Sequence, residues 1–542
     1  MARKGWGTLW FVFSKETTGP LDRLRASAAR YARDDVVDEC RFFNCILCGM
    51  AHLIIQVFRG RIGVKRNRWM RLVAWVALAA VCAAGMGRAQ LSGAQGQTPE
   101  ESYALEGMVV TPQGVVKDGM VLISGGAIAG VGAGIVLPKG TPVIKTGGVI
   151  FPGLIDLHNH LIWNVFPRWV PKLPDGQPTV VGDRYDWQAM PAYLAALSEP
   201  ERTMVDRGDG CDMERYAEMK AMLGGATSVV GSYGPTAEDP QRDECDRGLA
   251  RNLDTYSGLY GTKMNEEPVE YEVFPFQIPY EKAAEIRAEM DLGKVKALLL
   301  HVAEGKDASA AREFVMLQAR GFLRPGVSVI HGVALNAADF QEMAANGVGL
   351  IWSPHSNFAL YGVTADVAAA KTAGVTMAIG PDWSPSGSDG MVEEMQYAWA
   401  WDRKQTPEVF VPEDFERMAT ENPAKLAAAS DKIGALKEGM AADVVVFPAE
   451  GDAAAMALLD SKPGSVSLVV VGGKPLVGDP KLMQELLPGQ VLEQIQVCVY
   501  TKALNIKQDT GGESWAEIEA HLTQELGRLK MNLAPLAECG GN

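Results

Sequence analysis

The stretch Val149–Leu161, VIFPGLIDLHNHL, decides how the rest of this 542-residue chain is interpreted. Its apolar start predicts a buried strand, and two histidines one residue apart follow that strand. Because residues i and i+2 of a strand point to the same face, His158 and His160 are expected to point the same way. Imidazole binds zinc, iron or nickel, so the pair predicts half of a four-ligand metal site.

Four more segments join a short apolar run to a polar residue suited to chemistry. They are LLLHVAEG at 298–305, VIHG at 329–332, WSPHSN at 352–357 and AIGPD at 378–382. Strands are predicted at 227–232, 291–301, 327–331, 348–353 and 375–382, and two less legible ones between 253 and 277. The helix-length segments between strands are typical of a parallel α/β barrel, whose active site lies at the carboxyl ends of the strands.

These five segments, in their order and spacing, resemble the amidohydrolase superfamily of metal-dependent hydrolases. The likeness is strongest to its deaminase/chlorohydrolase and imidazolonepropionase-like branch, and it covers roughly residues 104–500. The resemblance implies an α/β fold, a TIM (β/α)8 barrel with a small composite β-sandwich formed from N- and C-terminal segments. Val- and Ile-rich runs between glycines at 104–146, repeated near the other end, independently predict antiparallel strands.

The expected organisation therefore has five parts. They are a leader at 1–89 that comprises an extension and a signal peptide at 66–89, a first β-sandwich segment at 90–148, the barrel at 149–432, a second β-sandwich segment at 433–500 and a helical tail at 501–542.

The metal ligands implied by the resemblance are His158, His160, His301 and Asp382. Three imidazoles and one carboxylate suit one divalent ion and leave a position open for water. Zinc is favoured, and iron is the alternative.

The resemblance also implies catalytic residues. Glu304, in the pattern His-Val-Ala-Glu, would carry protons between water and the leaving group, with His331 and Asp382 as the other catalytic residues. Substrate-binding roles are predicted for His331, Asn357, His355 and Trp163. Trp163 belongs to a Trp-, Pro- and Asp-rich insertion at 161–212 that leaves the metal-bearing strand end and is expected to roof the pocket.

Three functions remain open from the sequence. The first is hydrolysis of a C–N bond in a small molecule, by deamination or by cyclic amide or amidine hydrolysis. The second is a binuclear amide or dipeptide hydrolase, in which a carboxylated lysine such as Lys263 bridges two ions. The third is a non-catalytic binding protein on a retired barrel.

The leader predicts export. Basic residues precede an apolar run from Leu72 to Met86, and small residues precede a plausible cleavage site after Ala89. Fifteen apolar residues are short for a span of about 20, so a signal peptide is favoured over an uncleaved anchor. A periplasmic or extracellular protein without stable membrane insertion after cleavage is expected.

Charge and cysteines narrow the partners. Residues 1–89 carry 15 Lys and Arg against 6 Asp and Glu, so the remainder carries 36 against 60. Such an acidic body disfavours nucleic acid and leaves a small-molecule substrate, with a homo-oligomer allowed. Four cysteines follow the leader: Cys211, Cys245, Cys498 and Cys539. They permit three disulfide connectivities, and a Cys211–Cys245 bond is the first pairing to test.

Overall fold

The computed structural model describes residues 102–232, 248–254, 258–260, 268–449, 451 and 453–539. The predicted leader at 1–89, Lys263 and Cys245 lie outside these residues. The described residues belong to one compact unit, Gly96–Asn542. Within them, no helix has the length and apolar character needed to cross a membrane.

Segments from both ends of the described chain form one nine-stranded sheet, in the order β16-β17-β15-β14-β13-β4-β1-β2-β3. The strands are β1 (Ser102–Thr111), β2 (Gly114–Ser124), β3 (Ala127–Gly132), β4 (Val143–Pro152), β13 (Val444–Pro448), β14 (Leu468–Val471), β15 (Lys474–Gly478), β16 (Glu493–Val497) and β17 (Tyr500–Leu504). Antiparallel pairing of β13 with β4, with Val445 opposite Phe151, joins the two ends as predicted. The sheet runs on to Pro152 and Leu504, so the predicted boundaries at 148 and 500 are too early.

The stretch that opens the motif forms two strands, where the sequence predicted one. β4 ends at Pro152 in the nine-stranded sheet, and β5 (Leu154–Ile155) begins the parallel strands. Gly153 lies between them, its N–H donates to Asp443 O at 2.9 Å, and a Cβ atom there would collide with Thr227. The chain therefore crosses from one sheet to the other where no side chain fits.

Within the described residues, eight short strands pair in parallel and follow one another in chain order. One sheet has the order β5-β6-β7 and the other β12-β11-β10-β9-β8. The remaining bounds are β6 (Ala226–Val229), β7 (Arg251–Asn252), β8 (Val269–Glu272), β9 (Ala297–Val302), β10 (Val327–His331), β11 (Gly349–Trp352) and β12 (Met377–Ile379). The strand predicted at 291–301 begins only at Ala297, because the preceding helix, α9 (Tyr280–Asp291), extends to Asp291.

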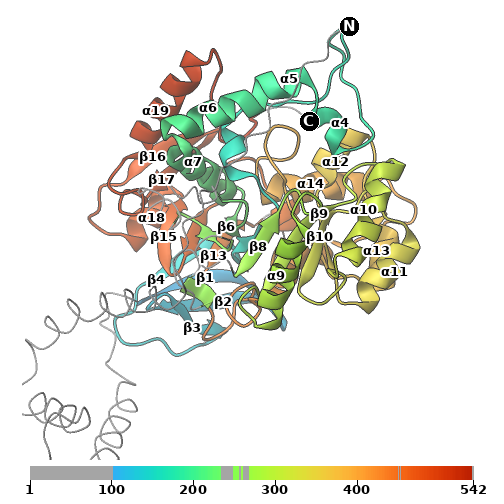
Figure 1. Ribbon diagram of the computed structural model, residues 1–542. Coiled ribbons are helices and arrows are strands. Elements are labelled where there is room, and N and C mark those ends of the chain that lie inside the picture. The colour runs from blue at the N-terminus through green and yellow to red at the C-terminus, as the bar shows by residue number, and fades with distance from the viewer. Residues whose placement is uncertain are drawn as a thin grey trace, which may run out of the picture. The chain divides into compact units, whose positions relative to one another are not determined.

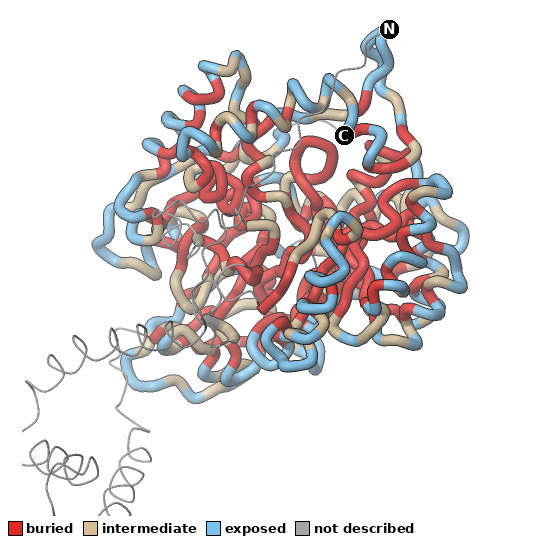
Figure 2. The backbone as a smooth tube through the Cα atoms, in the orientation of Figure 1, coloured by how far each residue is buried: buried red, intermediate tan, exposed pale blue. Residues whose placement is uncertain are grey.

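Helices follow the parallel strands in the chain, and they are α9 (Tyr280–Asp291), α10 (Ala308–Ala319), α11 (Ala337–Ala345), α12 (Pro354–Tyr361), α13 (Val367–Ala373), α14 (Met391–Asp402), α15 (Pro412–Ala419) and α16 (Glu421–Leu426). Of these, α9, α10, α11 and α13 lie on one side of the five-stranded sheet in Figure 1. Figure 2 shows buried strands behind helices whose outer turns are exposed. Helices α17 (Met456–Leu459), α18 (Pro480–Leu486) and α19 (Trp515–Arg528) accompany the C-terminal strands, and the Ser514 side chain caps the start of α19.

The insertion after β5 is mostly helical. It contains η3 (Leu161–Val165), α4 (Arg184–Gln188), α5 (Pro191–Tyr193), η4 (Leu194–Ser198), α6 (Glu199–Arg207) and the start of α7 (Gly210–Leu223). A further short helix, η5 (Gly258–Tyr260), precedes β8.

Successive side chains along a strand point to opposite faces of the sheet, so they belong to two different clusters of the core. In β9, Ala297 and Leu299 belong to an interior cluster that also takes a residue from or next to each of the other seven parallel strands. Leu298 and Leu300 instead belong to the cluster that packs beneath the helices. Since His301 shares the parity of Ala297 and Leu299, it points to the interior, at the carboxyl end of its strand.

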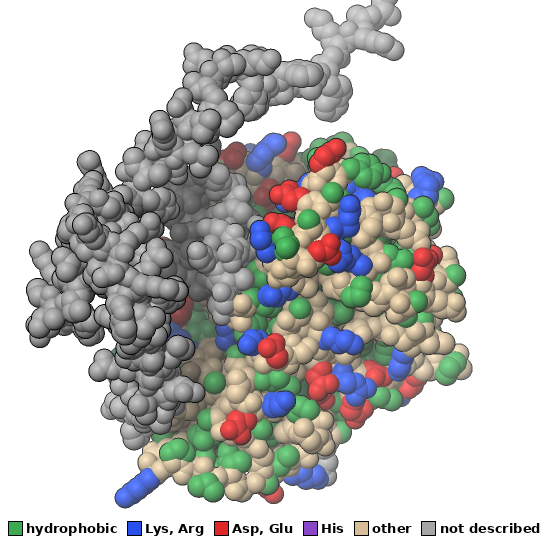
Figure 3. All heavy atoms as spheres, turned by 60° about the horizontal axis from the view of Figure 1, so that its bottom comes forward, with side chains coloured by type: hydrophobic (Ala, Val, Ile, Leu, Met, Phe, Trp, Pro, Cys, Tyr) green, Lys and Arg blue, Asp and Glu red, His purple; other side chains and the backbone are tan. Residues whose placement is uncertain are grey.

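Charges are mixed on the one face of the described residues that Figure 3 shows. On the face seen in Figure 3, Lys and Arg side chains alternate with Asp and Glu and do not gather into one basic patch.

Disulfides account for three of the described cysteines. Cys498 is bonded to Cys539, with Cα atoms 5.1 Å apart. Cys211 is also disulfide-bonded. Its predicted partner, Cys245, lies outside the described residues.

Candidate metal centre and active site

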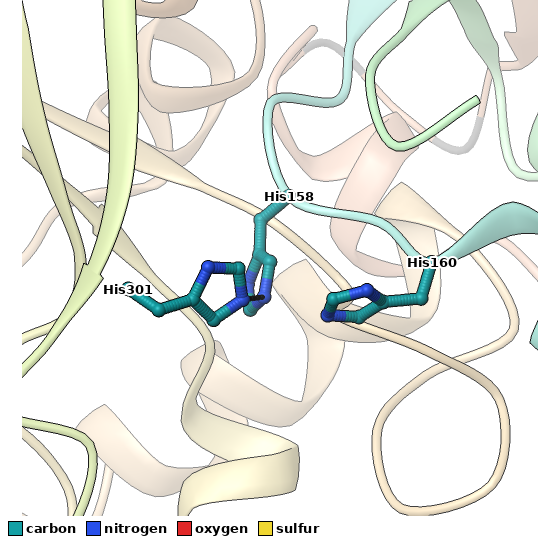
Figure 4. A group of neighbouring side chains, drawn as sticks. All are labelled: His158, His160 and His301. Carbon is teal, nitrogen blue, oxygen red and sulfur yellow. Dashed lines mark hydrogen bonds between the residues drawn. The ribbon is translucent and has the colours of Figure 1, made fainter. Parts of the chain in front are cut away.

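Three histidine rings converge at the carboxyl ends of the parallel strands (Figure 4). His158 Nε2 lies 3.2 Å from His301 Nε2 and 3.3 Å from Asp382 Oδ1. His160 Nε2 lies 3.4 Å from the same Asp382 oxygen. The ligand atoms of the three histidines all lie within 4.8 Å of one another, close enough for one ion to reach them.

Backbone hydrogen bonds hold the first and last ligand segments together. Asp382 N–H donates to His158 O at 2.9 Å, and His160 N–H donates to Asp382 O at 3.0 Å. Asp156 Oδ1 accepts the His158 N–H at 3.0 Å and fixes the same turn from the other side. Asp382 has φ of 68°, a left-handed conformation that is strained for a residue with a side chain. These contacts explain how the strained position is maintained.

The donors fit a divalent ion, because the imidazoles are held neutral with one nitrogen each aimed at the cluster. Burial lowers the pKa of His158 and of His301 well below the usual range, and neighbouring imidazoles lower both further. His301 Nδ1 lies 3.2 Å from Glu272 O; since a carbonyl only accepts, Nδ1 carries the hydrogen and Nε2 keeps its lone pair. Ser353 Oγ lies 2.6 Å from His158 Nδ1, and its oxygen is able to accept the Nδ1 hydrogen, an arrangement that leaves Nε2 available to an ion.

Glu304 follows β9 in a turn and lies beside His331, which ends β10. The Glu304 side chain is 5% exposed, and its Oε2 lies 3.7 Å from His331 Nε2. Burial raises the pKa of Glu304 to about 7, although Arg184 opposes the shift. A carboxyl group with such a pKa exchanges a proton readily near neutral pH.

A cavity of about 170 Å³ lies directly above these groups. Its polar side is formed by His160, His301, Glu304, His331 and Asp382. Its apolar side consists mainly of aromatic residues from the insertion and two strand-end loops: Trp163, Trp187, Tyr193, Phe274 and Trp383. Among the described residues that line it, none is Lys or Arg.

Of the four predicted substrate-binding residues, two line the cavity and two do not. Trp163 and His331 line the cavity, whereas Asn357 and His355 do not. Asn357 Oδ1 lies 2.8 Å from His331 Nδ1, so Asn357 contacts the ring of His331 and does not itself line the cavity. His355 stacks on Tyr397, with ring centroids 4.3 Å apart, and its Nδ1 lies 3.0 Å from Ser388 Oγ. Direct substrate contact by Asn357 or His355 stays a prediction.

Tyr271 is a site residue that the sequence did not reveal. It is the third residue of β8, the fourth parallel strand, and its hydroxyl donates to Asn159 O at 2.8 Å. Its ring centroid lies 5.4 Å from that of His301 and 5.8 Å from that of His160. β8 contains no lysine, and Lys263 precedes it outside the described residues. Tyr271 lies in the region 253–277, where the strands were hard to recognise, and it belongs to no motif in the sequence that would have indicated a role in the site.

Parallel strands that carry three imidazoles, a carboxylate and a buried proton-exchanging glutamate at their carboxyl ends define the class of metal-dependent hydrolases. The sequence model described as "Amidohydrolase family" matches residues 149–476. The chain belongs to the amidohydrolase family and is a hydrolase that acts on carbon–nitrogen bonds.

Relatives and solved structures agree with this assignment. The chain is 25% identical over 358 residues to a 5-methylthioadenosine/S-adenosylhomocysteine deaminase of Desulforudis audaxviator, which covers 61% of this chain and 80% of that protein. A zinc-bound adenosine deaminase of Xanthomonas campestris has a similar fold, with a TM-score of 0.57, 19% identity and coverage of 79% of this chain and 98% of that one. A zinc complex of atrazine chlorohydrolase from Arthrobacter aurescens has a TM-score of 0.55, 22% identity and coverage of 69% and 95%.

Proposed function

We propose that this protein hydrolyses a C–N bond in a small cyclic substrate, by deamination of the ring or by opening a cyclic amide or amidine. The observation that carries the proposal is that Glu304 and His331 line the same cavity as the metal cluster. The deaminase relative and the zinc-bound deaminase fold described above support the same chemistry.

One divalent ion, with zinc favoured, would be held by His158, His160, His301 and Asp382. Such an ion supplies Lewis acidity that lowers the pKa of water and makes it nucleophilic near neutral pH. Tyr271 supports a single ion, because the fourth strand presents an aromatic ring beside the histidines where the binuclear alternative requires a bridging lysine.

Glu304 moves the proton. In its ionised form it accepts a proton from the attacking water, and as an acid it returns that proton to the departing nitrogen. A C–O bond forms, the C–N bond breaks, and the nitrogen leaves as ammonia or as a neutral amine of the opened ring. The pKa of about 7 suits both steps, since neither form of the carboxyl group is strongly disfavoured.

His331 orients the substrate. Asn357 Nδ2 donates to Thr364 Oγ1 at 3.1 Å, so Asn357 Oδ1 faces His331 Nδ1 and accepts its hydrogen. The neutral ring then presents the Nε2 lone pair to the cavity, where it accepts a hydrogen bond from a substrate N–H. The aromatic wall excludes water and packs against the faces of a planar ring.

The test is a screen of metal-loaded protein against amino-substituted heterocycles, cyclic amidines, lactams and dipeptides. We expect ammonia release or ring opening from a cyclic compound, lost after chelation and regained with zinc. Dipeptide hydrolysis with two ions per chain would favour the binuclear alternative. Tight ring binding without turnover would favour a binding protein.

We also infer that the eight parallel strands close into a TIM barrel. Hydrogen bonds between Asp382 and the His158–His160 turn join the segment after the first strand to the segment after the last, and the interior cluster takes residues from or next to all eight strands. We infer that the nine-stranded sheet folds into the predicted two-layer β-sandwich.

Export to the periplasm or the extracellular space remains our proposal. It rests on the sequence of residues 66–89 and is supported by the Cys498–Cys539 bond, because disulfides persist in oxidising compartments.

A further inference from the structure

Arg184, in the insertion, reaches the proton-carrying glutamate from outside the parallel strands. Its side chain is 1% exposed, and Nη1 lies 3.5 Å from Glu304 Oε2. Its Nη2 lies 3.2 Å from Glu313 Oε1, and Nη1 donates to Val273 O at 2.7 Å. A guanidinium with these fixed partners has one orientation, so the position of Glu304 Oε2 relative to it is defined.

Helix α4, which contains Arg184, also reaches the other carboxylate oxygen, Glu304 Oε1, through the side chain of Tyr361. Tyr361, the last residue of α12, donates its hydroxyl hydrogen to Glu304 Oε1 at 2.6 Å. Trp187 of α4 donates its Nε1–H to the Tyr361 oxygen at 2.9 Å, which leaves the tyrosine hydrogen for Glu304. Helix α4 therefore constrains both oxygens of the carboxylate.

Backbone contacts attach this part of the insertion to the turn that carries Glu304. Arg184 N–H donates to Glu304 O at 3.2 Å, and Lys306 N–H donates to Gly182 O at 2.7 Å. Gly305 has φ of 145°, and a Cβ atom there would meet Asp183 at 2.6 Å. The turn and the insertion are packed too closely for either to shift alone.

We infer that the insertion positions the catalytic carboxylate: Arg184, together with Trp187 acting through Tyr361, holds Glu304 in the orientation that proton transfer requires. This inference rests on the proposed function. Arg184 does not line the cavity, so it acts through Glu304 and is a positioning residue. Glu304 Oε2 is thereby kept toward His331 Nε2 and the substrate position, while Oε1 is occupied by Tyr361.

A purely structural role for Arg184 makes different predictions, because a structural defect lowers stability and metal content together. Mispositioning of a reacting group by about 1 Å costs about 10²-fold in rate without loss of binding. The decisive variants are Arg184→Met, which removes the charge, and Arg184→Lys, which keeps the charge but loses the planar fork. Arg320→Met is the matched control, since Arg320 is buried and donates to Phe276 O and Ile278 O without contacting Glu304.

For folded, metal-loaded Arg184→Met we expect kcat to fall about 10²-fold with KM little changed. Guanidinium ion added to Arg184→Met should restore part of kcat, and Arg184→Lys should lie between the two. Arg320→Met should keep kcat and show no rescue. Equal losses in the two methionine variants, or unchanged kcat in Arg184→Met, would overturn the inference.

Tyr361→Phe tests the second contact without removing a charge, in case Arg184→Met does not fold. Its kcat should fall while metal content and fold are kept, and an unchanged kcat would contradict the role of Tyr361.

Crystal structures give a readout that needs no turnover. The Glu304 carboxylate should leave its position between Tyr361 and His331 in Arg184→Met and in Tyr361→Phe. A carboxylate that keeps its position in both variants would overturn the inference. Absence of activity in a substrate screen of the unmodified protein would count against the proposed function alone, and this structural test could still be made.

Discussion

Asp382 Oδ1 lies 3.3 Å from His158 Nε2, so the residue that follows the last parallel strand meets the residue that follows the first. Neither side chain is more than 5% exposed. We propose that this buried carboxylate and imidazole are metal ligands, and that His160 and His301 complete the set around them. The proposed chemistry depends on this cluster.

Removal of a ligand should remove the metal. His158→Ala and Asp382→Ala each leave three protein ligands, and we expect metal analysis of purified, folded protein to find most of the bound ion lost. His355→Ala is the matched control, because His355 contacts Ser388 and Tyr397 and lies outside the cluster. One full equivalent of metal in His158→Ala, or two equivalents in the unmodified protein, would be incompatible with the single-ion site.

The hydroxyl that orients the first ligand should also affect affinity. Ser353→Ala removes the group 2.6 Å from His158 Nδ1, and loss of such an outer contact typically weakens metal binding about 10- to 100-fold. Competition with a chromogenic chelator measures the change. Ser356→Ala, also fully buried, should bind metal as the unmodified protein does. Equal affinity of the two variants would exclude a role for Ser353.

Much of the candidate site could be predicted from the sequence because its residues lie at or just after strand ends. His158, His301, His331 and Asp382 each follow a short apolar run, and that pattern is local. β7 and β8 were less legible, because β7 has two residues and β8 alternates Val and Tyr with glutamates.

The residues that support the site could not be found in this way. Arg184, Tyr361 and Ser353 contact Glu304 or His158 only through the tertiary fold. Ser353 lies within the segment WSPHSN, but nothing in that segment predicts its contact with His158. The crossing at Gly153 was also missed, since VIFPGLI reads as one apolar strand until the two sheets separate there.

Stability should depend on pH through the buried carboxyl group of Glu394, which is not one of the proposed metal ligands. Burial raises the pKa of Glu394 to about 8, from about 4.3 in an unfolded chain. Between these values the folded state binds more protons than the unfolded state, so the free energy of unfolding falls as pH rises. Glu394→Gln cannot titrate and should lose this contribution, which amounts to about 1.4 kcal/mol per pH unit.

Urea unfolding of Glu394→Gln and of the unmodified protein at several pH values between 5 and about 8 measures the difference. Glu285→Gln, on an exposed side chain of α9, should retain the pH dependence of the unmodified protein. Parallel stability curves for Glu394→Gln and the unmodified protein would show that Glu394 does not titrate in this window.

The leader prediction can be examined in the native host. Mature protein is expected outside the cytoplasm, with an amino terminus near Gln90, because the apolar run at 72–86 is the length of a signal-peptide core. Cell fractionation and amino-terminal sequencing would establish both points. Intact chains that begin at Met1 and remain in the cytosol would contradict export.

The most direct measurement is metal content and steady-state turnover of Glu304→Gln on one preparation. Since glutamine is nearly isosteric and still accepts a hydrogen bond from Tyr361, fold and metal should be retained. Turnover should nevertheless fall about 10²- to 10⁴-fold, the usual contribution of a positioned acid–base group. Near-normal turnover would remove Glu304 from the mechanism, and loss of the metal would make it a ligand.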